Sequence, residues 1–293
     1  MMVEASSTCN LRCPLCLWTH NDRHGQLAPA TFARFINEAR TFLRRICFAG
    51  RGEPTLNPRV YEILRLCADA GVIADLATNG TRLAHNVDRI LDCGVDNVNV
   101  SIEADNAADY ARYRVRGDFD EVVEGMRRLA EAKHRRRLRK PNLQTVSVIF
   151  GFNEDALERM KAFFRELGFE NFTFKSAHLG HGQLSEDMTT LQQQWLPRDP
   201  GRRRAIFNDR EHVECSFLPK AQLLWNGDIT RCAVHQNQMI IGNVLESSFR
   251  DIWRGPRSRA AVATIVEGRF AACQSCEFSG RHVEETAHER YVV

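Results

Sequence analysis

The chain has 293 residues, of which 43% are hydrophobic and 26% are charged, so it is long enough to bury a sizeable core. Its formal net charge is only +3, and no apolar run reaches the roughly 18 residues that a membrane-spanning helix needs. The first residues also lack the layout of a secretory signal, so membrane and exported proteins are excluded and we expect a cytoplasmic protein.

Apolar runs of strand length alternate with amphipathic, helix-length segments over the first 180 residues. This alternation is typical of βα units around a parallel sheet. We expect strands at 3–7, 44–50, 72–78, 97–103, 143–150 and 171–177. Helices are expected at 29–43, 58–71, 86–94, 119–134 and 154–168. Such units, joined by right-handed crossovers, predict an α/β fold, a partial (β/α)6 TIM-like barrel with ligands at the carboxyl ends of its strands.

Three cysteines, Cys9, Cys13 and Cys16, directly follow the first expected strand in the run CNLRCPLC. A [4Fe-4S] cluster takes four ligands, so a loop with three thiolates leaves one iron open to an outside ligand. A structural zinc ion would instead need a fourth protein donor, which His20 or His24 could supply. Taken alone, the loop leaves both metal centres open.

Further motifs stand at the ends of the next four expected strands: FAGRGEPTLNP at 48–58, LATNGT at 76–81, VSIEA at 100–104 and FGFNED at 150–155. Together with the CxxxCxxC loop, they resemble the radical S-adenosylmethionine (SAM) superfamily over about residues 3–178. The resemblance implies an enzyme whose Cys9, Cys13 and Cys16 hold a [4Fe-4S] cluster, with SAM bound to the open iron.

The same resemblance implies which residues contact SAM. Gly50, Gly52 and Glu53 would hold the methionyl group, Ser101 and Glu103 the ribose, Arg114 or Arg116 the carboxylate, and Asn153 the adenine, with Thr78 and Asn79 in the third-strand motif.

A basic run, HRRRLRK at 134–140, could contact phosphates. We interpret it as the solvated end of a helix before Pro141, and we do not expect nucleic acid to be a partner.

The alternation of strands and helices stops after about residue 180. Residues 181–212 are rich in polar residues, Pro and Arg, which indicates a linker between a barrel at 1–180 and a small unit at 213–293. That unit begins with a predicted β-hairpin at 221–232, because Asn226-Gly227 is a strong two-residue turn signal. A helix at 249–268 and a cysteine-rich end complete it.

Four more cysteines, Cys215, Cys232, Cys273 and Cys276, belong to this C-terminal unit. A zinc ribbon is one interpretation of paired thiolates. However, four residues separate Gly227 from Cys232, and the segment 241–253 follows, an arrangement that resembles the SPASM and twitch extensions of radical SAM enzymes. A full SPASM extension has enough cysteines for two auxiliary clusters. The four here imply a shortened, twitch-type extension that holds one auxiliary [4Fe-4S] cluster.

Three cysteines remain. Cys67 and Cys93 fall near the ends of expected helices, where a small buried side chain is the ordinary interpretation. Cys47 lies in the second strand and could face the barrel interior, where a thiol could return a hydrogen atom. His178 and His181, at the end of the sixth strand, are the candidate bases.

The short chain with one auxiliary cluster resembles dehydrogenases and epimerases of aminocyclitols and aminoglycoside-like sugars. This implies hydrogen abstraction from a carbinol, base-assisted proton loss and electron transfer to the auxiliary cluster, which yields a ketone. A flavodoxin- or ferredoxin-type protein would donate the first electron. The alternatives are an epimerase of the same substrates, a peptide-modifying maturase and, from another class, a zinc-containing nucleic-acid-binding protein.

Overall fold

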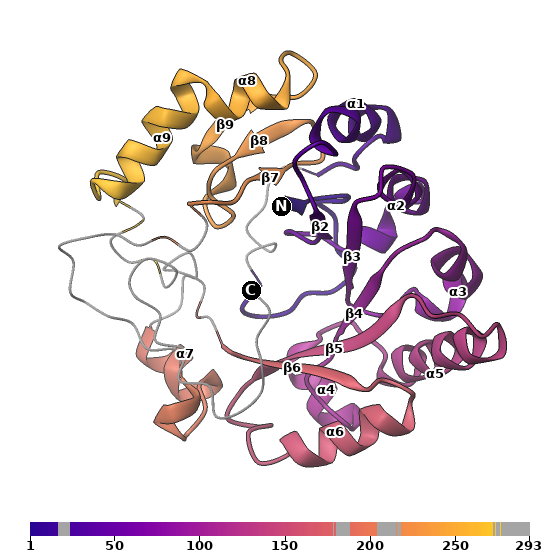
Figure 1. Ribbon diagram of the computed structural model, residues 1–293. Coiled ribbons are helices and arrows are strands. Elements are labelled where there is room, and N and C mark those ends of the chain that lie inside the picture. Colours follow the sequence, from indigo (N-terminus) through magenta and orange to yellow (C-terminus); the bar gives the residue numbers. More distant parts are fainter. Residues whose placement is uncertain are drawn as a thin grey trace.

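The computed structural model describes residues 1–16, 24–177, 179, 188–203, 215, 218–271, 273 and 276. Within these residues one curved sheet has the strand order β6-β5-β4-β3-β2-β1-β7-β8-β9. Figure 1 looks along its axis and shows the strands as an arc with helices outside. The strands are β1 (Met2–Val3), β2 (Arg45–Phe48), β3 (Ile73–Thr78), β4 (Asn97–Ser101), β5 (Asn142–Ile149), β6 (Asn171–Ser176), β7 (Gln222–Leu223), β8 (Asp228–Thr230) and β9 (Ile240–Asn243).

Strands β1 to β6 pair in parallel and in chain order. The described sheet does not close, because β6 and β9 form its two edges. The prediction of a partial TIM-like barrel is therefore confirmed.

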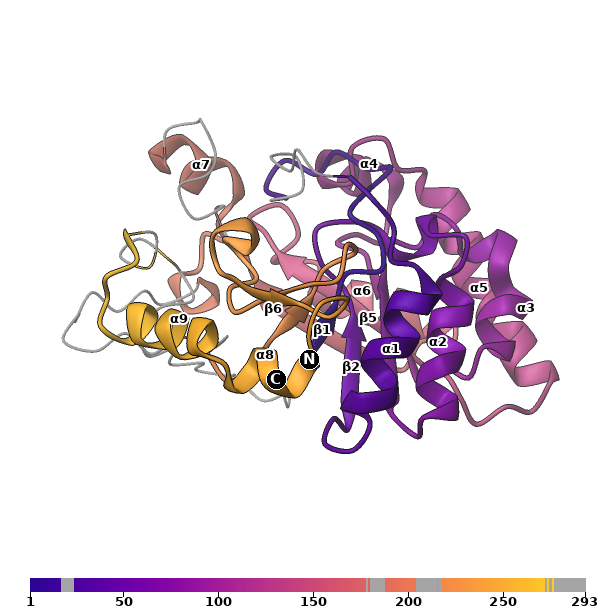
Figure 2. The same ribbon diagram turned by 90° about the horizontal axis from the view of Figure 1, so that it is seen from above.

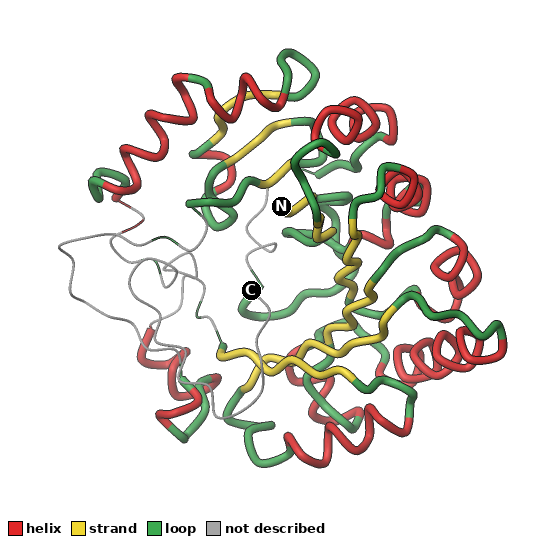
Figure 3. Tube along the Cα trace, viewed as in Figure 1, coloured by secondary structure: helices red, strands yellow, loops and turns green. Residues whose placement is uncertain are grey.

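Helices cover the outer face of the sheet, as Figure 3 shows by colour. They are α1 (Pro29–Ala39), α2 (Val60–Asp69), α3 (Leu83–Asp92), α4 (Ala107–Tyr113), α5 (Phe119–Arg135) and α6 (Leu157–Glu166). The sequence analysis did not expect α4. Its N-cap, Asn106, accepts a hydrogen bond from the Asp109 backbone N–H, which is the usual chemistry of a helix start.

The two faces of the sheet differ in polarity, as β4 illustrates. Val98 and Val100 are fully buried in the core under the helices. Asn97 and Asn99, which alternate with them along the strand, are only half-buried. Because successive side chains of a strand point to opposite faces, the asparagines face the interior of the barrel. The barrel interior is thus a polar, ligand-accepting surface.

The C-terminal unit continues the barrel sheet. The expected hairpin is present as β7 and β8, with Gly227 in the left-handed region at φ +92°. In addition, β7 pairs in parallel with β1, which the sequence did not indicate. The expected helix at 249–268 is two helices, α8 (Phe249–Arg254) and α9 (Pro256–Val266), because Pro256 has no N–H to continue the first one.

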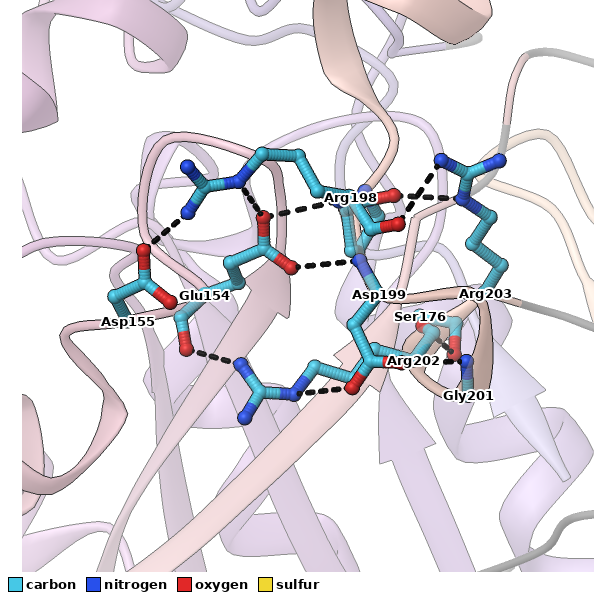
Figure 4. Close-up of polar contacts among 9 residues, drawn as sticks. Glu154, Asp155, Ser176, Arg198, Asp199, Gly201, Arg202 and Arg203 are labelled. Atoms are coloured by element: carbon cyan, nitrogen blue, oxygen red, sulfur yellow. Dashed lines mark hydrogen bonds and ion pairs between the residues drawn. The ribbon is translucent and has the colours of Figure 1, made fainter.

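Part of the expected linker packs against the barrel. It contains α7 (Met188–Trp195), which Figure 2 shows at the same end of the barrel as α4. The next residues bind the loop after β5, where the Glu154 carboxylate accepts hydrogen bonds from the Arg198 backbone N–H (2.9 Å), Arg198 Nε (2.7 Å) and the Asp199 N–H (3.2 Å) (Figure 4). Arg202 donates to the Glu154 carbonyl in the same group. This group fixes residues 198–202 beside the barrel.

Short 3-10 turns complete the described elements at Pro54–Leu56, Pro200–Arg202 and Gln236–Gln238.

Several smaller expectations are confirmed. The basic residues after α5 are mostly exposed, and Arg136 pairs there with Asp88 and Asp92. Cys67 and Cys93 are buried in the main core. No helix in the described ranges is long and apolar enough to cross a membrane.

Glu38 of α1 joins the barrel to α8, since its carboxylate accepts hydrogen bonds from the backbone N–H groups of Phe249 (2.8 Å) and Arg250 (3.0 Å). We expect Glu38→Ala to lower the free energy of unfolding by about 1–2 kcal/mol, because it leaves the first N–H groups of α8 without an acceptor. Anaerobic thermal denaturation checks this. The control is Glu62→Ala, which removes an exposed partner of Arg59 and should change little. Equal losses in both variants would contradict the role of Glu38.

Candidate active site

The loop with the first three cysteines leaves the sheet after β1 and is anchored by a second apolar core. Cys13 is buried, Cys9 and Cys16 are half-buried, and all three carry free thiols. The side chains around them are largely apolar and come from the loop itself, from α4, from the end of β5 and from α7: Leu11, Leu15, Tyr113, Phe150, Leu191 and Trp195. The sheet and α7 together therefore hold the three sulfurs in a water-poor place.

Polar donors from other strand ends also reach these sulfurs. Asn79, after β3, donates to Cys9 Sγ at 3.8 Å and to Asn10 Oδ1 at 3.0 Å. Arg114 Nη1 donates to Cys13 Sγ at 3.9 Å. Donors aimed at sulfur stabilise thiolates that are bound to a cluster.

Gly52 lets the loop after β2 approach the loop after β1. A Cβ at this position would lie 2.1 Å from the Ser6 carbonyl oxygen and 2.7 Å from that of Thr8. The next residue, Glu53, donates its N–H to the Thr8 carbonyl at 2.7 Å. Gly52, the second glycine of the GRGEP motif, is therefore required for the two loops to pair.

The Glu53 carboxylate is buried and joins β2 to β3. Its Oε1 accepts from the Thr55 N–H (3.0 Å) and from Thr78 Oγ1 (2.8 Å), and its Oε2 accepts from the Asn79 N–H (2.7 Å). These bonds explain why Glu53 in the second-strand motif occurs together with Thr78 and Asn79 in the third-strand motif. A direct contact of Glu53 with the methionyl group stays a prediction.

The end of β4 is connected to the cysteine loop by a buried ion pair. Arg114 makes two bonds of 2.6 Å to the Glu103 carboxylate. Both side chains are largely buried, at 12% and 1% exposed. Arg116, the alternative for the SAM carboxylate, is exposed and has a left-handed backbone at φ +72°. The geometry places Arg114, not Arg116, beside Cys13.

Ser101 and Asn153 lie at the ends of neighbouring strands. Ser101 is half-buried and pairs in register with Val146. Asn153 is buried, and its amide nitrogen donates to the carbonyls of Glu103 and Val148, each at 2.9 Å. Asn153 therefore shapes the turn after β5. A contact of either residue with SAM stays a prediction.

The four C-terminal cysteines form a second site against β8, β9 and α9. Cys273 and Cys276 are buried, and Cys215 and Cys232 are half-buried. Cys215, Cys232 and Cys273 share an apolar cluster with Met239 and Ile265. The His235 backbone N–H donates to Cys232 Sγ at 3.2 Å. Burial, with a smaller contribution from the other three thiols of this set, raises the pKa of the Cys273 thiol to about 12.

Both sets of thiols fit [4Fe-4S] clusters. Within the described part of the chain, no three His, Cys, Asp or Glu side chains converge on a point that would hold a single metal ion. A cluster instead distributes its thiolates over separate irons, so its cysteines need not converge. Burial raises the pKa of Cys13 to about 12, so iron binding must displace protons here.

Cys47 faces the barrel interior, as the sequence suggested. Ile46 and Phe48 on either side of it are fully buried in the core under the helices. Burial raises the pKa of Cys47 to about 11, and among the charges that act on it is Lys175 of β6. The other proposed catalytic residues, His178 and His181, lie outside the described residues.

The sequence analysis missed two charged residues, Glu4 and Arg51. Glu4 is 2% exposed, and its carboxylate accepts from the Arg51 backbone N–H at 3.3 Å. A carboxylate within the otherwise small and apolar strand run VEASS was the available signal. Burial raises the pKa of Glu4 to about 7.

A half-open parallel barrel with three thiols at one strand end and four more in a C-terminal unit defines an iron–sulfur enzyme. Residues 3–167 match the family model of the radical SAM superfamily, and residues 215–277 match that of the SPASM iron-sulfur cluster-binding domain. The chain belongs to the radical SAM superfamily. Its cofactors are SAM and two [4Fe-4S] clusters, one that binds SAM and one auxiliary.

Curated relatives are diverse. The chain is 24% identical over 307 residues to the tungsten-containing aldehyde ferredoxin oxidoreductase cofactor-modifying protein of Pyrococcus furiosus, across 94% of this chain and 86% of that one. It is 34% identical to the AdoMet-dependent heme synthase of Methanosarcina barkeri and 33% to the PqqA peptide cyclase of Methylobacterium nodulans. Those two matches span 44% and 38% of this chain, and only 38% and 30% of the relatives' own lengths.

Solved structures share the fold. BtrN in complex with AdoMet and 2-DOIA has a TM-score of 0.58 at 17% identity, over 99% of this chain and 95% of BtrN. Streptococcus suis SuiB bound to precursor peptide SuiA has a TM-score of 0.65 at 14% identity, over 94% of this chain and 70% of SuiB. The anSMEcpe protein with bound AdoMet has a TM-score of 0.63 at 14% identity, over 91% and 79%.

Replacement of cysteines should separate the two clusters. The reconstituted chain is expected to hold about eight irons, and either Cys13→Ala or Cys232→Ala should leave about four. Only Cys13→Ala should abolish SAM cleavage in the absence of substrate. Iron analysis and electron paramagnetic resonance measure this, with Cys67→Ala as the control that keeps all the iron. Full iron content in the Cys232→Ala variant would contradict the second site.

The Glu103–Arg114 pair should be sensitive to the loss of its cation. Arg114→Met leaves a buried carboxylate without its partner, so we expect the free energy of unfolding to fall by about 3–5 kcal/mol. Part of this should return in the double variant Glu103→Gln/Arg114→Met, which buries neither charge. Thermal denaturation measures the series, with exposed Arg116→Met as the control. A single variant as stable as the parent would refute the assignment.

Proposed function

We propose that this enzyme oxidises a secondary alcohol of a small aminocyclitol or amino sugar to a ketone. The observation that carries the proposal is the set of four cysteines in the C-terminal unit, whose strands belong to the same sheet as the barrel. Four thiolates complete the ligands of a [4Fe-4S] cluster and leave it no open iron for substrate. Such a site suits electron transfer better than substrate binding.

The bound cofactors would supply a 5′-deoxyadenosyl radical at the first site and an electron acceptor at the second. The residues of the chain must then hold the carbinol between the two sites, exclude water and accept the hydroxyl proton. The substrate loses one hydrogen atom, one proton and one electron, which together make a two-electron oxidation. We also propose a flavodoxin- or ferredoxin-type protein as the donor of the initiating electron.

The comparison with solved structures supports a small substrate. This chain and BtrN match nearly end to end, and BtrN was solved with AdoMet and 2-DOIA. SuiB and anSMEcpe were solved with peptides, and the chain spans 70% and 81% of those proteins. Their TM-scores are as high as that of BtrN, so the fold itself is compatible with either substrate class.

One observation favours epimerisation as a second candidate. Cys47 faces the barrel interior, and its raised pKa keeps it as a thiol at neutral pH. A thiol can return a hydrogen atom to a substrate radical, which would invert a carbon without net oxidation.

Product analysis distinguishes the two reactions. The reduced, reconstituted enzyme with SAM and a panel of aminocyclitols should yield 5′-deoxyadenosine and a product two mass units lighter. Mass spectrometry in D2O measures this, with Cys47→Ala run in parallel. We expect this variant to keep the oxidation. A product of unchanged mass in H2O that gains one mass unit in D2O with the parent, and that is lost in Cys47→Ala, would establish the epimerase instead.

A further inference from the structure

A group of buried polar side chains lies between the two sets of cysteines and has no role so far. Its members come from the end of β1, the loop after β2, and β7 with the turn that follows β8: Glu4, Arg51, Gln222 and Gln236. Glu4 and Gln222 are each 2% exposed, and Gln236 is 4% exposed. Polar groups buried this deeply normally have hydrogen-bond partners, so each needs a physical reason.

The group converges on Gly50. A Cβ at Gly50 would lie 3.1 Å from Glu4 Cγ and 3.2 Å from Gln222 Nε2. Gln236 Nε2 donates to Gln222 Oε1 at 3.0 Å, which orients the Gln222 amide so that its nitrogen points toward this place. The Glu4 side chain and the Gln222 amide nitrogen are thus both held against Gly50, where β1 pairs with β7.

Two donors in the group have no acceptor within the described residues. Gln222 Nε2 and Arg51 Nε are both buried and make no hydrogen bond there. A buried donor without an acceptor destabilises the folded chain. A ligand oxygen that accepted from both nitrogens would remove this cost.

Glu4 presents the opposite requirement. Its carboxylate accepts from the backbone N–H groups of Arg51 and Trp225 and from the Gln236 side chain, and the Arg51 charge also acts on it. Burial outweighs these contacts and raises its pKa to about 7, so the site does not fully stabilise the negative charge. Glu4 also lines a small cavity with Trp225, Asn226, Asp228 and Asn237. Asp228 accepts hydrogen bonds from Asn226 (2.7 Å) and Asn243 (2.9 Å), so its carboxylate is already occupied. A ligand cation would therefore be stabilised most at Glu4.

Arg51 places this group between the two iron–sulfur sites. Cys16 of the first set and Cys232 of the second both act electrostatically on its guanidinium. Its Nη2 donates to the carbonyl of Val234, two residues after Cys232. A molecule held here would lie between the radical source and the electron acceptor.

We propose that Glu4, Arg51 and Gln222 form a substrate subsite for a 1,2-amino alcohol. In it, Glu4 binds the ammonium group, and Arg51 Nε and Gln222 Nε2 donate to the neighbouring hydroxyl oxygen. This subsite rests on the proposed function. It specifies which part of the substrate the chain recognises, namely the ammonium group and the neighbouring hydroxyl. A peptide backbone would satisfy the two donors through a carbonyl group but would offer no cation to Glu4.

Binding experiments test this with matched probes. The loaded enzyme with SAM is titrated anaerobically by calorimetry with 2-deoxystreptamine, which has amino groups, and with myo-inositol, which has only hydroxyls. We expect Glu4→Gln to weaken 2-deoxystreptamine by about tenfold or more and to leave myo-inositol unchanged. Gln222→Met should weaken both probes. The control is Asp75→Asn, which replaces a buried carboxylate of β3 that pairs with Arg45. This variant should change neither affinity.

Each other outcome overturns the subsite. Unchanged affinity for 2-deoxystreptamine in Glu4→Gln removes the ammonium partner, and an equal loss for both probes reduces Glu4 to a structural residue. A parent enzyme that binds neither probe refutes the substrate class. Iron content and thermal stability show whether each variant folds. If Glu4→Gln does not fold, Glu4→Asp, which keeps the charge, is used in its place. Glu4→Asp should still prefer 2-deoxystreptamine to myo-inositol.

The subsite and the proposed reaction fail separately. Oxidation by the parent with unchanged affinity in Glu4→Gln refutes the subsite alone. Selective, Glu4-dependent binding without a product two mass units lighter refutes the oxidation alone.

Discussion

Strand β1 is the element on which the rest of the structure depends. It is only two residues long in the sheet, yet it pairs in parallel with β2 on one side and with β7 on the other. Its continuation carries Glu4 and then the loop of Cys9, Cys13 and Cys16. The strand therefore links the SAM-binding cluster, the GRGEP loop and the C-terminal unit within a few residues. Any shift of its register would displace all three.

Buried electrostatic contacts keep the strand ends in register around this element. Glu53 connects β2 to β3, and the Glu103–Arg114 pair connects β4 to the cysteine loop. Each carboxylate is surrounded by donors from a different strand end, so the burial of its charge is compensated only in the folded arrangement. Such contacts specify one geometry for the site in a way that apolar packing alone would not. This explains why the motif residues are polar although they are buried.

The sequence was sufficient for the features that leave a local signal. The apolar run at 97–103 predicted the strand β4, and Asn226-Gly227 predicted the hairpin, whereas the polar inner face of β4 was found only in the structure. The parallel pairing of β1 with β7 left no such signal, because it joins residues about 220 positions apart through only two pairs. The carboxylate of Glu4 in the run VEASS was a local signal, but its neighbours Gln222 and Gln236 come from the distant C-terminal unit, as does Val234, which accepts a hydrogen bond from Arg51. Arg114 and Arg116 were equivalent in sequence, and only the structure separated them, because Arg114 pairs with Glu103 and reaches Cys13 whereas Arg116 is exposed.

The position of Cys47 bears on whether the substrate is oxidised or epimerised. The lack of a cysteine near the end of the sixth strand favoured oxidation, because an epimerase needs a hydrogen donor. In the structure, however, Cys47 pairs in register with Met2, and Glu4 follows two residues further on the same face of the sheet. A thiol therefore lies below the proposed subsite, on the same inner surface of the barrel. The case for oxidation rests on the closed four-cysteine site and on Arg51, which directs the subsite toward Cys232. If the proposed subsite binds the substrate, its orientation would decide the reaction: a radical carbon that faces Cys232 would be oxidised, and one that faces Cys47 would receive a hydrogen atom.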